Sequence, residues 1–196
     1  MTLSPASWTG ILLAAGRGRR FDPHGVEDKL QQILPDGHPV ALTAAQHLSS
    51  VMKHVVVVVR PDNRALLQEF QHQLYEVVIC PDADQGMAAS LTCGLRHAAR
   101  SKGWIIALAD MPFVKSSTIA ALLRELENGA DIVVPVFQGQ RGNPVGFSGK
   151  YLPELLALSG DRGARGLLQQ FSVREVPVDD AGILQDIDLP TDLSAQ

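Results

Sequence analysis

The stretch Ile11–Phe21, ILLAAGRGRRF, joins an apolar run to a short glycine turn that is followed by three arginines. The apolar residues predict a buried strand, which we expect over Trp8–Ala14. Gly16 and Gly18 allow a tight turn and a close approach of the backbone to a ligand, because neither carries a Cβ atom. The arginines place positive charge at the carboxyl end of the strand, where open α/β sheets bind their ligands. The stretch therefore predicts a polyphosphate-binding loop, with a solvated basic turn as the alternative.

Two familiar phosphate-binding motifs do not fit this loop. A P-loop ends in Gly-Lys-Ser/Thr, and no such sequence follows Gly16. The dinucleotide fingerprint needs a third small residue where Phe21 stands, and Asp22-Pro23-His24-Gly25 prevents the helix that should begin there. The loop therefore predicts a phosphate site of another kind.

Composition narrows the class of protein. The chain has 196 residues, with 45% hydrophobic and 19% charged residues, so we expect one globular domain over residues 1–196. The net charge of −4 argues against nucleic acid as a partner. No charged-then-apolar leader opens the chain and no apolar run approaches a membrane span, so we expect no membrane association and a cytoplasmic protein. Cys80 and Cys93 lack metal-site spacing, and we expect both to be small buried hydrophobic residues.

Apolar segments alternate with amphipathic ones along most of the chain. The segment His54–Arg60, HVVVVVR, is apolar without alternation, which predicts a strand covered on both faces. The same character recurs at Tyr75–Cys80, Trp104–Ala109 and Asp131–Val136. The segments between them predict helices at Val40–Val51, Asn63–Gln73, Met87–Arg100 and Ser117–Glu127. The alternation predicts an α/β fold with a mostly parallel sheet between layers of helices.

One predicted helix and the last third of the chain complete this outline. In the third helix, Met87, Leu91, Leu95 and Ala98 fall on one face at helical spacing. After Val136 we expect a loop running into a strand, two short helices, a further strand and a final half-turn, at Phe137–Gly149, Tyr151–Leu158, Ala164–Phe171, Val173–Val178 and after Asp186, respectively.

Three aspartates are candidate metal ligands. Asp110 directly follows an apolar strand, and Met111-Pro112 then changes the chain direction. A carboxylate at that position fits a hard cation such as Mg²⁺, which one or two carboxylates hold together with substrate phosphates. An N-cap or turn aspartate is the alternative. Asp186 and Asp188 form a second acidic pair, and either could complete the site, although Asp188 could instead stabilise the start of the last helix, with Pro190 in its first turn.

Two further segments are weaker candidates. Lys29, taken alone, is typical of a solvated lysine before an amphipathic segment. The segment Gln85–Ser90 begins a helix, and its unpaired first-turn amides could bind a polar edge or an anion, with helix capping as the alternative. No His-Glu-x-x-His or Gly-x-Ser-x-Gly pattern occurs, so zinc-dependent hydrolysis and serine hydrolysis are not supported.

In combination, these motifs resemble the MobA-like nucleotidyltransferase family, whose first half is similar to sugar-phosphate nucleotidylyltransferases. The family's opening motif corresponds to Leu13–Phe21 followed by Lys29, and its Asp-Met-Pro motif to Asp110–Pro112. A Gly-Met-Ser-Ser-Ser-Leu segment corresponds to Gly86–Leu91, and the family's ending to Asp188–Leu193. The resemblance implies a three-layer Rossmann-like nucleotidyltransferase fold.

Two later segments, Arg141–Phe147 and Ser159–Arg165, are similar to molybdenum cofactor cytidylyltransferases. The chain departs from the family pattern in three ways. The loop before Lys29 is a couple of residues longer, Asn143 stands where a histidine is common, and Ala88 and Ala89 replace serines. The last two departures fall in regions where the acceptor or the base is expected.

The resemblance implies transfer of CMP from CTP to the phosphate of a molybdopterin-type cofactor, with release of pyrophosphate and with Mg²⁺ as cofactor. Ala15 resembles the cytidine users of the family, whereas glycine there resembles the guanosine users. A recipient molybdoenzyme or its chaperone is a further expected partner. The alternatives are a guanylyltransferase, a sugar- or polyol-phosphate nucleotidylyltransferase, a non-catalytic molybdenum cofactor chaperone and, least favoured, a dinucleotide-dependent oxidoreductase.

The same resemblance assigns four groups of site residues. It implies catalytic roles for Arg20, Lys29 and Asp110, and metal binding by Asp110, Asp186 and Asp188. It implies nucleotide binding by Leu13, Ala14, Ala15, Gly16, Arg17, Gly18, Lys29, Asp82, Gly86, Met87 and Ser90. It implies acceptor binding by Arg141, Gly142, Asn143, Pro144, Asp161, Arg162 and Arg165.

Overall fold

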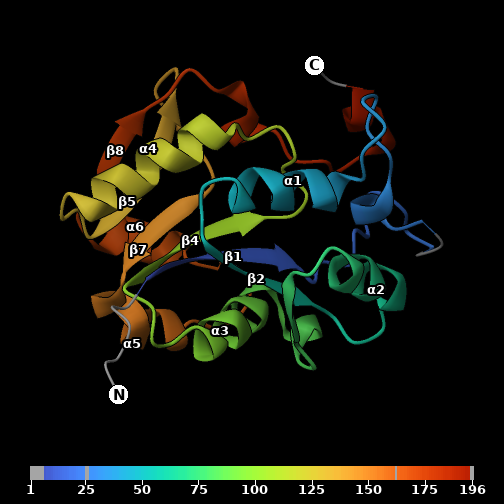
Figure 1. Cartoon of the computed structure of the whole chain (residues 1–196), viewed down its shortest axis with the longest axis horizontal. Coiled ribbons are helices and arrows are strands. Elements are labelled where there is room, and N and C mark those ends of the chain that lie inside the picture. The colour runs from blue at the N-terminus through green and yellow to red at the C-terminus, as the bar shows by residue number, and fades with distance from the viewer. Residues whose placement is uncertain (1–6, 25–26, 162, 195–196) are drawn as a thin grey trace.

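A computed structural model describes residues 7–24, 27–161 and 163–194. Within these residues eight strands form one sheet in the order β3-β2-β1-β4-β7-β5-β6, with β8 paired to β5 (Figure 1). The three central parallel strands are β2 (His54–Val59), β1 (Trp8–Ala14) and β4 (Gly103–Leu108). Ile11 of β1 is in register with Val56 and Ile106, so the apolar runs lie side by side.

The outer strands complete a mostly parallel sheet. They are β3 (Glu76–Ile79), β5 (Ile132–Phe137), β6 (Gln140–Arg141), β7 (Val145–Ser148) and β8 (Arg174–Pro177). β3 pairs in parallel with β2 and β8 in parallel with β5, whereas β7 runs antiparallel to both β4 and β5. β6 forms a short hairpin with β5. The predicted α/β fold with a mostly parallel sheet is confirmed.

Helices cover both faces of the sheet, and a separate apolar core lies under each layer. Figure 1 shows α1 (Val40–Ser49) and α4 (Ser116–Glu127) over one face and α3 (Met87–His97) with α5 (Leu152–Leu156) on the other. Side chains of α2 (Arg64–His72) join the first core, and those of α6 (Arg165–Gln170) join the second. The described part of the chain also has five short 3₁₀ turns, at Lys29–Gln31, Ala83–Gln85, Gly149–Tyr151, Ala181–Leu184 and Pro190–Ser194.

Several details differ from the sequence-based expectations. β3 is partly exposed on both faces, because it is the edge strand of the described sheet, and was wrongly expected to be covered on both sides. On α3, Leu91 and Leu95 are buried, but Met87 is 42% exposed because it lies at the start of the helix, beside a cavity. Cys80 is buried, whereas Cys93 is only partly buried. Residues 185–188 belong to no strand, so Asp186 and Asp188 do not share a strand face.

The topology positions the candidate site at one edge of the sheet. The carboxyl ends of β1, β2 and β4 lead to Gly16, Arg60 and Asp110, in line with the ligand-binding edge of open parallel sheets. Nowhere in the described part of the chain is a helix long and apolar enough to cross a lipid bilayer.

Candidate active site

A cavity of about 400 Å³ opens where the central strands end. The glycine loop after β1, the start of α3 and the end of β4 form its walls. Ten of the predicted site residues line it, namely Leu13, Ala15, Gly16, Arg17, Lys29, Gly86, Met87, Ser90, Asp110 and Asp161. Five lining residues were not assigned to the site from the sequence, namely Arg19, Leu30, Ala83, Asp84 and Leu108.

Lys29 is the buried cation of this cavity. Lys29 is only 7% exposed, and its Nζ lies 2.6 Å from Oδ2 of Asp110 and 3.3 Å from Oδ1 of Asp188. A buried ammonium is stable only when carboxylates or other acceptors replace its water shell, and here two carboxylates do so. Lys29 is therefore a buried residue of the cavity wall, in contrast to the solvated lysine that its isolated sequence context suggested.

The C-terminal segment delivers the second carboxylate. The backbone N–H of Ile187 donates to the carbonyl oxygen of Asp110 over 2.8 Å, which holds the two aspartate-bearing segments together. Oδ2 of Asp188 also forms an ion pair with Nη1 of Arg20 at 2.5 Å. Asp192, and not Asp188, organises the last turn, because its carboxylate accepts from the N–H groups of Asp188 and Leu189.

Three carboxylates are the residues that could hold a metal. Asp110 and Asp188 converge on one point, since both contact the same ammonium nitrogen. Burial raises the pKa of the Asp186 carboxyl, and the neighbouring Asp188 and Asp110 charges add to the rise. Oxygen donors of this kind fit Mg²⁺ or Mn²⁺, which need one or two carboxylates when substrate phosphates supply further ligands. In the described residues no cluster of three or more metal-ligating side chains is preformed.

The glycine loop presents its backbone to the cavity. Gly18 has a φ of +60°, and its carbonyl oxygen accepts from the N–H of Phe21 over 2.9 Å, so the chain turns back sharply there. A Cβ atom on Gly16 would meet no described residue within 4 Å, because that side of the backbone faces open space. The carbonyl oxygen of Gly16 accepts from Nη1 of Arg60 over 2.8 Å. The loop can therefore approach a ligand closely without changing shape.

Arg17 is committed to two carboxylates at the cavity rim. Its Nη2 donates to Asp84 over 2.6 Å, its Nε also pairs with Asp84, and its Nη1 lies 3.1 Å from Asp62. The hydrogen bond with Asp84 and the charge of Asp62 raise the pKa of Arg17, while Arg17 lowers the pKa of Asp84. Asp62 and Asp84 were missed from the sequence. Their positions after β2 and β3 indicate the same sheet edge as the arginine, but not the pairing itself, which depends on how the loops pack.

The start of α3 packs against a loop that was assigned to the acceptor. Gly86 has a φ of +114°, and a Cβ atom there would lie 2.8 Å from the carbonyl carbon of Gly160. The N–H of Ala88 donates to the carbonyl oxygen of Gly160 over 3.0 Å. Asp161 consequently lines the same cavity as Gly86 and Ser90. The predicted nucleotide and acceptor segments meet at this wall.

The remaining predicted residues lie away from the cavity lining. Ala14 is buried in the core, and Asp82 accepts from Nε2 of Gln85. Arg141 pairs with Glu175 at 2.7 Å, and Arg165 begins α6. Gly142 packs against Ile183, while Asn143 and Pro144 line a separate small cavity together with Met111, close to Asp110. Arg162 lies outside the described residues.

Comparison with known proteins assigns the chain to a family. The model of the MobA-like NTP transferase domain matches residues 10–176. The chain belongs to the MobA-like NTP transferase family. The match runs from β1 to β8 and includes the glycine loop, Lys29, the start of α3 and Asp110, but it ends before Asp188.

Curated relatives of this MobA-like chain carry several names. It is 31% identical to the purine catabolism protein PucB of Bacillus subtilis, over 92% of this chain and 91% of the relative. It is 27% identical to nicotine blue oxidoreductase of Paenarthrobacter nicotinovorans, over 83% of this chain and 81% of the relative. It is 23% identical to a probable molybdenum cofactor guanylyltransferase of Bacillus cytotoxicus, over 85% and 80% of the two chains.

Solved structures share the fold. The crystal structure of Rv0371c from Mycobacterium tuberculosis matches with a TM-score of 0.84 and 25% identity, and the match covers 97% of this chain and 96% of that one. A second structure of Rv0371c, in complex with manganese, matches with a TM-score of 0.78 and 24% identity over 95% of each chain. The expected nucleotidyltransferase fold is thereby confirmed for this MobA-like protein.

Proposed function

We propose that the protein transfers CMP from CTP to the phosphate of a molybdopterin-type cofactor and releases pyrophosphate. The observation that carries the proposal is the position of Lys29 in the nucleotide-sized cavity, in contact with both Asp110 and Asp188. This is an arrangement for a polyanion, because a cation, two potential metal ligands and an open glycine backbone face one space.

In this reaction an acceptor phosphate oxygen forms a bond to the α-phosphorus of the nucleotide. The bond from that phosphorus to the bridging oxygen breaks, and the electron pair leaves with pyrophosphate. Lys29 and Arg20 would neutralise the phosphate oxygens, and the Gly16–Gly18 backbone would position them. Asp110 and Asp188, with Asp186 beside them, would hold Mg²⁺. When bound, the ion supplies charge neutralisation on the reacting phosphates. No protein nucleophile is needed for this chemistry.

Two observations bear on the choice of nucleotide. Ala15 is 6% exposed and lines the cavity, so its methyl group reduces the space available to a purine. The family association of alanine at this position also favours CTP. GTP is the second candidate, because a relative is named as a probable molybdenum cofactor guanylyltransferase. The manganese complex of the similar Rv0371c supports a divalent metal, with Mg²⁺ as our proposed ion.

The experiment is a pyrophosphate-release assay with purified protein, Mg²⁺ and molybdenum cofactor, with CTP and GTP supplied separately. We expect CTP-dependent release that requires the acceptor. Ala15→Gly should shift the ratio of kcat/KM for CTP and GTP toward GTP by roughly tenfold, since pocket size discriminates by about 1–3 kcal/mol per methylene. A wild type that prefers GTP would show the guanylyl candidate to be right.

A parallel assay separates the other classes. Release of pyrophosphate with a sugar or polyol phosphate, and none with molybdenum cofactor, would indicate the related nucleotidylyltransferases. Binding of molybdenum cofactor without turnover would indicate a carrier. Oxidation of a nicotinamide cofactor with no pyrophosphate from any triphosphate would indicate an oxidoreductase and reject the proposal.

A further inference from the structure

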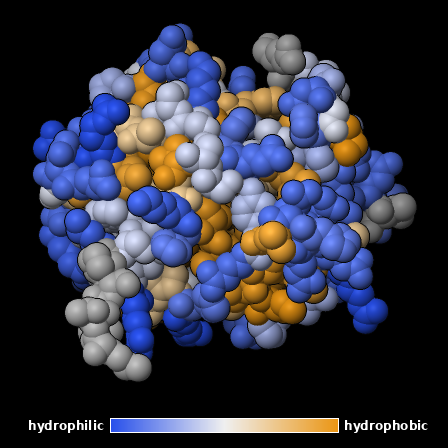
Figure 2. All heavy atoms as spheres, viewed as in Figure 1, coloured by the Kyte–Doolittle hydropathy of each residue, from blue (hydrophilic) through white to orange (hydrophobic). Residues whose placement is uncertain are grey.

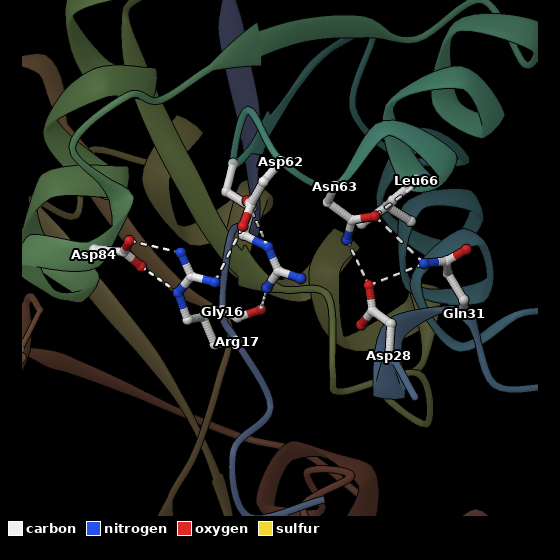
Figure 3. A network of polar contacts seen from close by, with 9 residues as sticks. Gly16, Arg17, Asp28, Gln31, Asp62, Asn63, Leu66 and Asp84 are labelled. Carbon is white, nitrogen blue, oxygen red and sulfur yellow. Dashed lines mark hydrogen bonds and ion pairs between the residues drawn. The ribbon is translucent and has the colours of Figure 1, made fainter. Parts of the chain in front are cut away.

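The turn after β2 contacts both ends of the loop that joins the glycine turn to Lys29. This turn, Arg60–Asn63, lies between Arg17 and Asp28 in Figure 3, with polar contacts on each side. Twelve residues separate Gly16 from Lys29, a stretch that is longer than the family pattern leads us to expect. A longer loop loses more conformational entropy when its ends are held in place, so its ends need anchors.

The first anchor holds the glycine end. Asp62 accepts from Nη1 of Arg17 over 3.1 Å and forms an ion pair with Nε of Arg60 at 3.0 Å, while Nη1 of Arg60 donates to the carbonyl oxygen of Gly16. Both arginines are therefore tied to the turn and to the loop at once. Figure 3 shows the side chain of Arg17 between the carboxylates of Asp62 and Asp84.

The second anchor holds the lysine end. Nδ2 of Asn63 donates to Oδ2 of Asp28 over 2.5 Å, and Nε2 of Gln31 donates to the same oxygen over 3.0 Å. The other oxygen of Asp28 accepts from the N–H of Leu30 over 3.0 Å, which caps the 3₁₀ turn that begins at Lys29. The position of the Lys29 backbone thus depends on where Asp28 is held.

The side chain of Asn63 has two separate structural roles, and a different polar atom carries each. Its Nδ2 reaches Asp28, while its Oδ1 accepts from the N–H of Leu66 over 3.2 Å and caps α2. The residue is 6% exposed; its contact with Leu66 is buried, and its contact with Asp28 is partly buried. Asparagine is suited to this position because one amide group supplies a donor and an acceptor in fixed geometry.

We propose that Asn63 is a positioning residue for Lys29, acting through Asp28, and that this contact matters for triphosphate binding as well as for the fold. The inference rests on the proposed function, because it concerns the same triphosphate. A flexible lysine would have to be ordered by the ligand at a cost in affinity, whereas an anchored lysine is already placed. Displacement of a catalytic group by about 1 Å costs on the order of 100-fold in rate.

One substitution of Asn63 separates its contact with Asp28 from its capping of α2. Asn63→Asp keeps an oxygen to cap α2 but replaces the donor to Asp28 with a second carboxylate, so repulsion opens the contact. The double variant Asn63→Asp with Asp28→Asn exchanges the two groups and restores a donor–acceptor pair. The introduced amide oxygen can still accept from Leu30, and Gln31 can still donate to residue 63, whose Oδ1 lies 3.4 Å from it in the wild type. Gln68→Glu is the matched control, since it adds the same charge on the exposed side of α2.

The experiment measures three quantities for the wild type and these variants. They are the Kd of CTP and GTP with Mg²⁺ by calorimetry without acceptor, the kcat and KM of pyrophosphate release, and amide hydrogen exchange over residues 27–34 without ligand. For Asn63→Asp we expect a loss of about 10- to 100-fold in triphosphate affinity and in kcat/KM, with faster exchange over residues 27–34. The double variant should recover most of each quantity, and Gln68→Glu should match the wild type.

Two results would overturn the inference. The first is faster exchange in Asn63→Asp with unchanged Kd and kcat/KM, which would leave Asn63 with a purely structural role. The second is a folded double variant that recovers neither exchange protection nor affinity, since the donor–acceptor pair would then not be the cause. Failure of the proposed function is distinct, because there the wild type itself would bind and use neither triphosphate.

Discussion

At the scale of single residues, the candidate site depends on how charges are balanced around Lys29. The buried ammonium of Lys29 lies between the carboxylates of Asp110 and Asp188, so the positive and negative charges of these side chains balance one another. A polyphosphate with its cation would compete for the same groups, so the site can accept both charges without exposing an unpaired one. The arrangement thus explains why these residue types occur together at this sheet edge.

Replacement of Asp110 by asparagine should nearly abolish turnover while the protein stays folded. The substitution keeps the size of the side chain but removes one charge from the proposed metal ligands and from the partners of Lys29, and we expect a loss of roughly 100-fold or more in kcat. Steady-state pyrophosphate release at saturating Mg²⁺ is the measurement. Asp36→Asn, on an exposed loop, is the control. Near wild-type kcat in Asp110→Asn would show that Asp110 is only a turn residue.

Cys93 should be slow to alkylate at neutral pH although it is partly exposed. Burial raises the pKa of its thiol to about 11, and the neighbouring Cys80 adds to the rise. At pH 8 a thiol with that pKa is about 0.1% thiolate, so the rate with iodoacetamide should increase about tenfold per pH unit up to pH 10. Mass spectrometry of the modified peptide is the measurement. Cys80→Ala should make Cys93 react faster, and a rate equal to that of free cysteine would contradict the expected pKa.

At the scale of secondary-structure elements, the sequence predicts best what is buried on both faces. A valine run such as that of β2 can only be a central strand, because its side chains need apolar cover on each side. The edge strand β3 has the same residue types but a different environment, and its exposure depends on what pairs with it. Some helix ends match the expected residue and others differ by one to three residues, since capping contacts such as Asn63 to Leu66 depend on local geometry.

The residues of the candidate site also differ in how well the sequence predicts them. Residues within contiguous motifs, such as Gly16 or Asp110, could be proposed from sequence because the motif itself carries the chemistry, and their roles stay predictions. The anchors Asp62, Asn63 and Asp84 could not, because each contacts a residue 35 to 67 positions away in sequence. Polar contacts across that separation are set by the packing of the loops at the sheet edge, which no local pattern encodes.

Two glycines of the cavity wall should respond in opposite ways to alanine. Gly86→Ala should destabilise the protein by about 1–3 kcal/mol, because φ is +114° and the new Cβ would press on Gly160. Gly16→Ala should leave stability nearly unchanged but reduce triphosphate affinity, since its Cβ would point into open space beside the cavity. Thermal unfolding and calorimetric titration with CTP measure the two effects. A destabilised Gly16→Ala with normal affinity would show that this backbone does not face the ligand.

At the scale of the whole molecule, the site is complete only because the C-terminal segment returns to the sheet. The chain after β8 passes along α4, packs Gly182 against Phe113 and pairs Ile183 with Asn143 before Ile187 bonds to Asp110. Ile183 and Ile187 are both buried, so this path belongs to the core and not to a loose tail. Asp188 therefore reaches Lys29 through contacts that begin at the far end of the segment.

Asp180 attaches the C-terminal segment to the start of α4. It is 1% exposed, and its carboxylate accepts from the N–H of Lys115 over 2.9 Å, the hydroxyl of Thr118 over 2.6 Å and the N–H of Gly182 over 3.0 Å. Asp180→Ala leaves three donors without their acceptor, two of them buried, and we expect a loss of roughly 2–4 kcal/mol in the free energy of unfolding. In a protein of this size that lowers Tm by about 5 to 15 °C.

Thr118→Val is the matched comparison, because it removes one donor and leaves the carboxylate with the other two. We expect it to cost about 1 kcal/mol and to keep triphosphate affinity. Asp180→Ala should also weaken triphosphate binding well below its Tm, because the segment that carries Asp188 to Lys29 loses its first anchor. Thermal unfolding and calorimetry with CTP at 20 °C test both expectations. Equal Tm values for the two variants would show that the hydroxyl contact alone fastens the segment, and unchanged affinity in Asp180→Ala would show that Ile187 holds Asp188 in place without it.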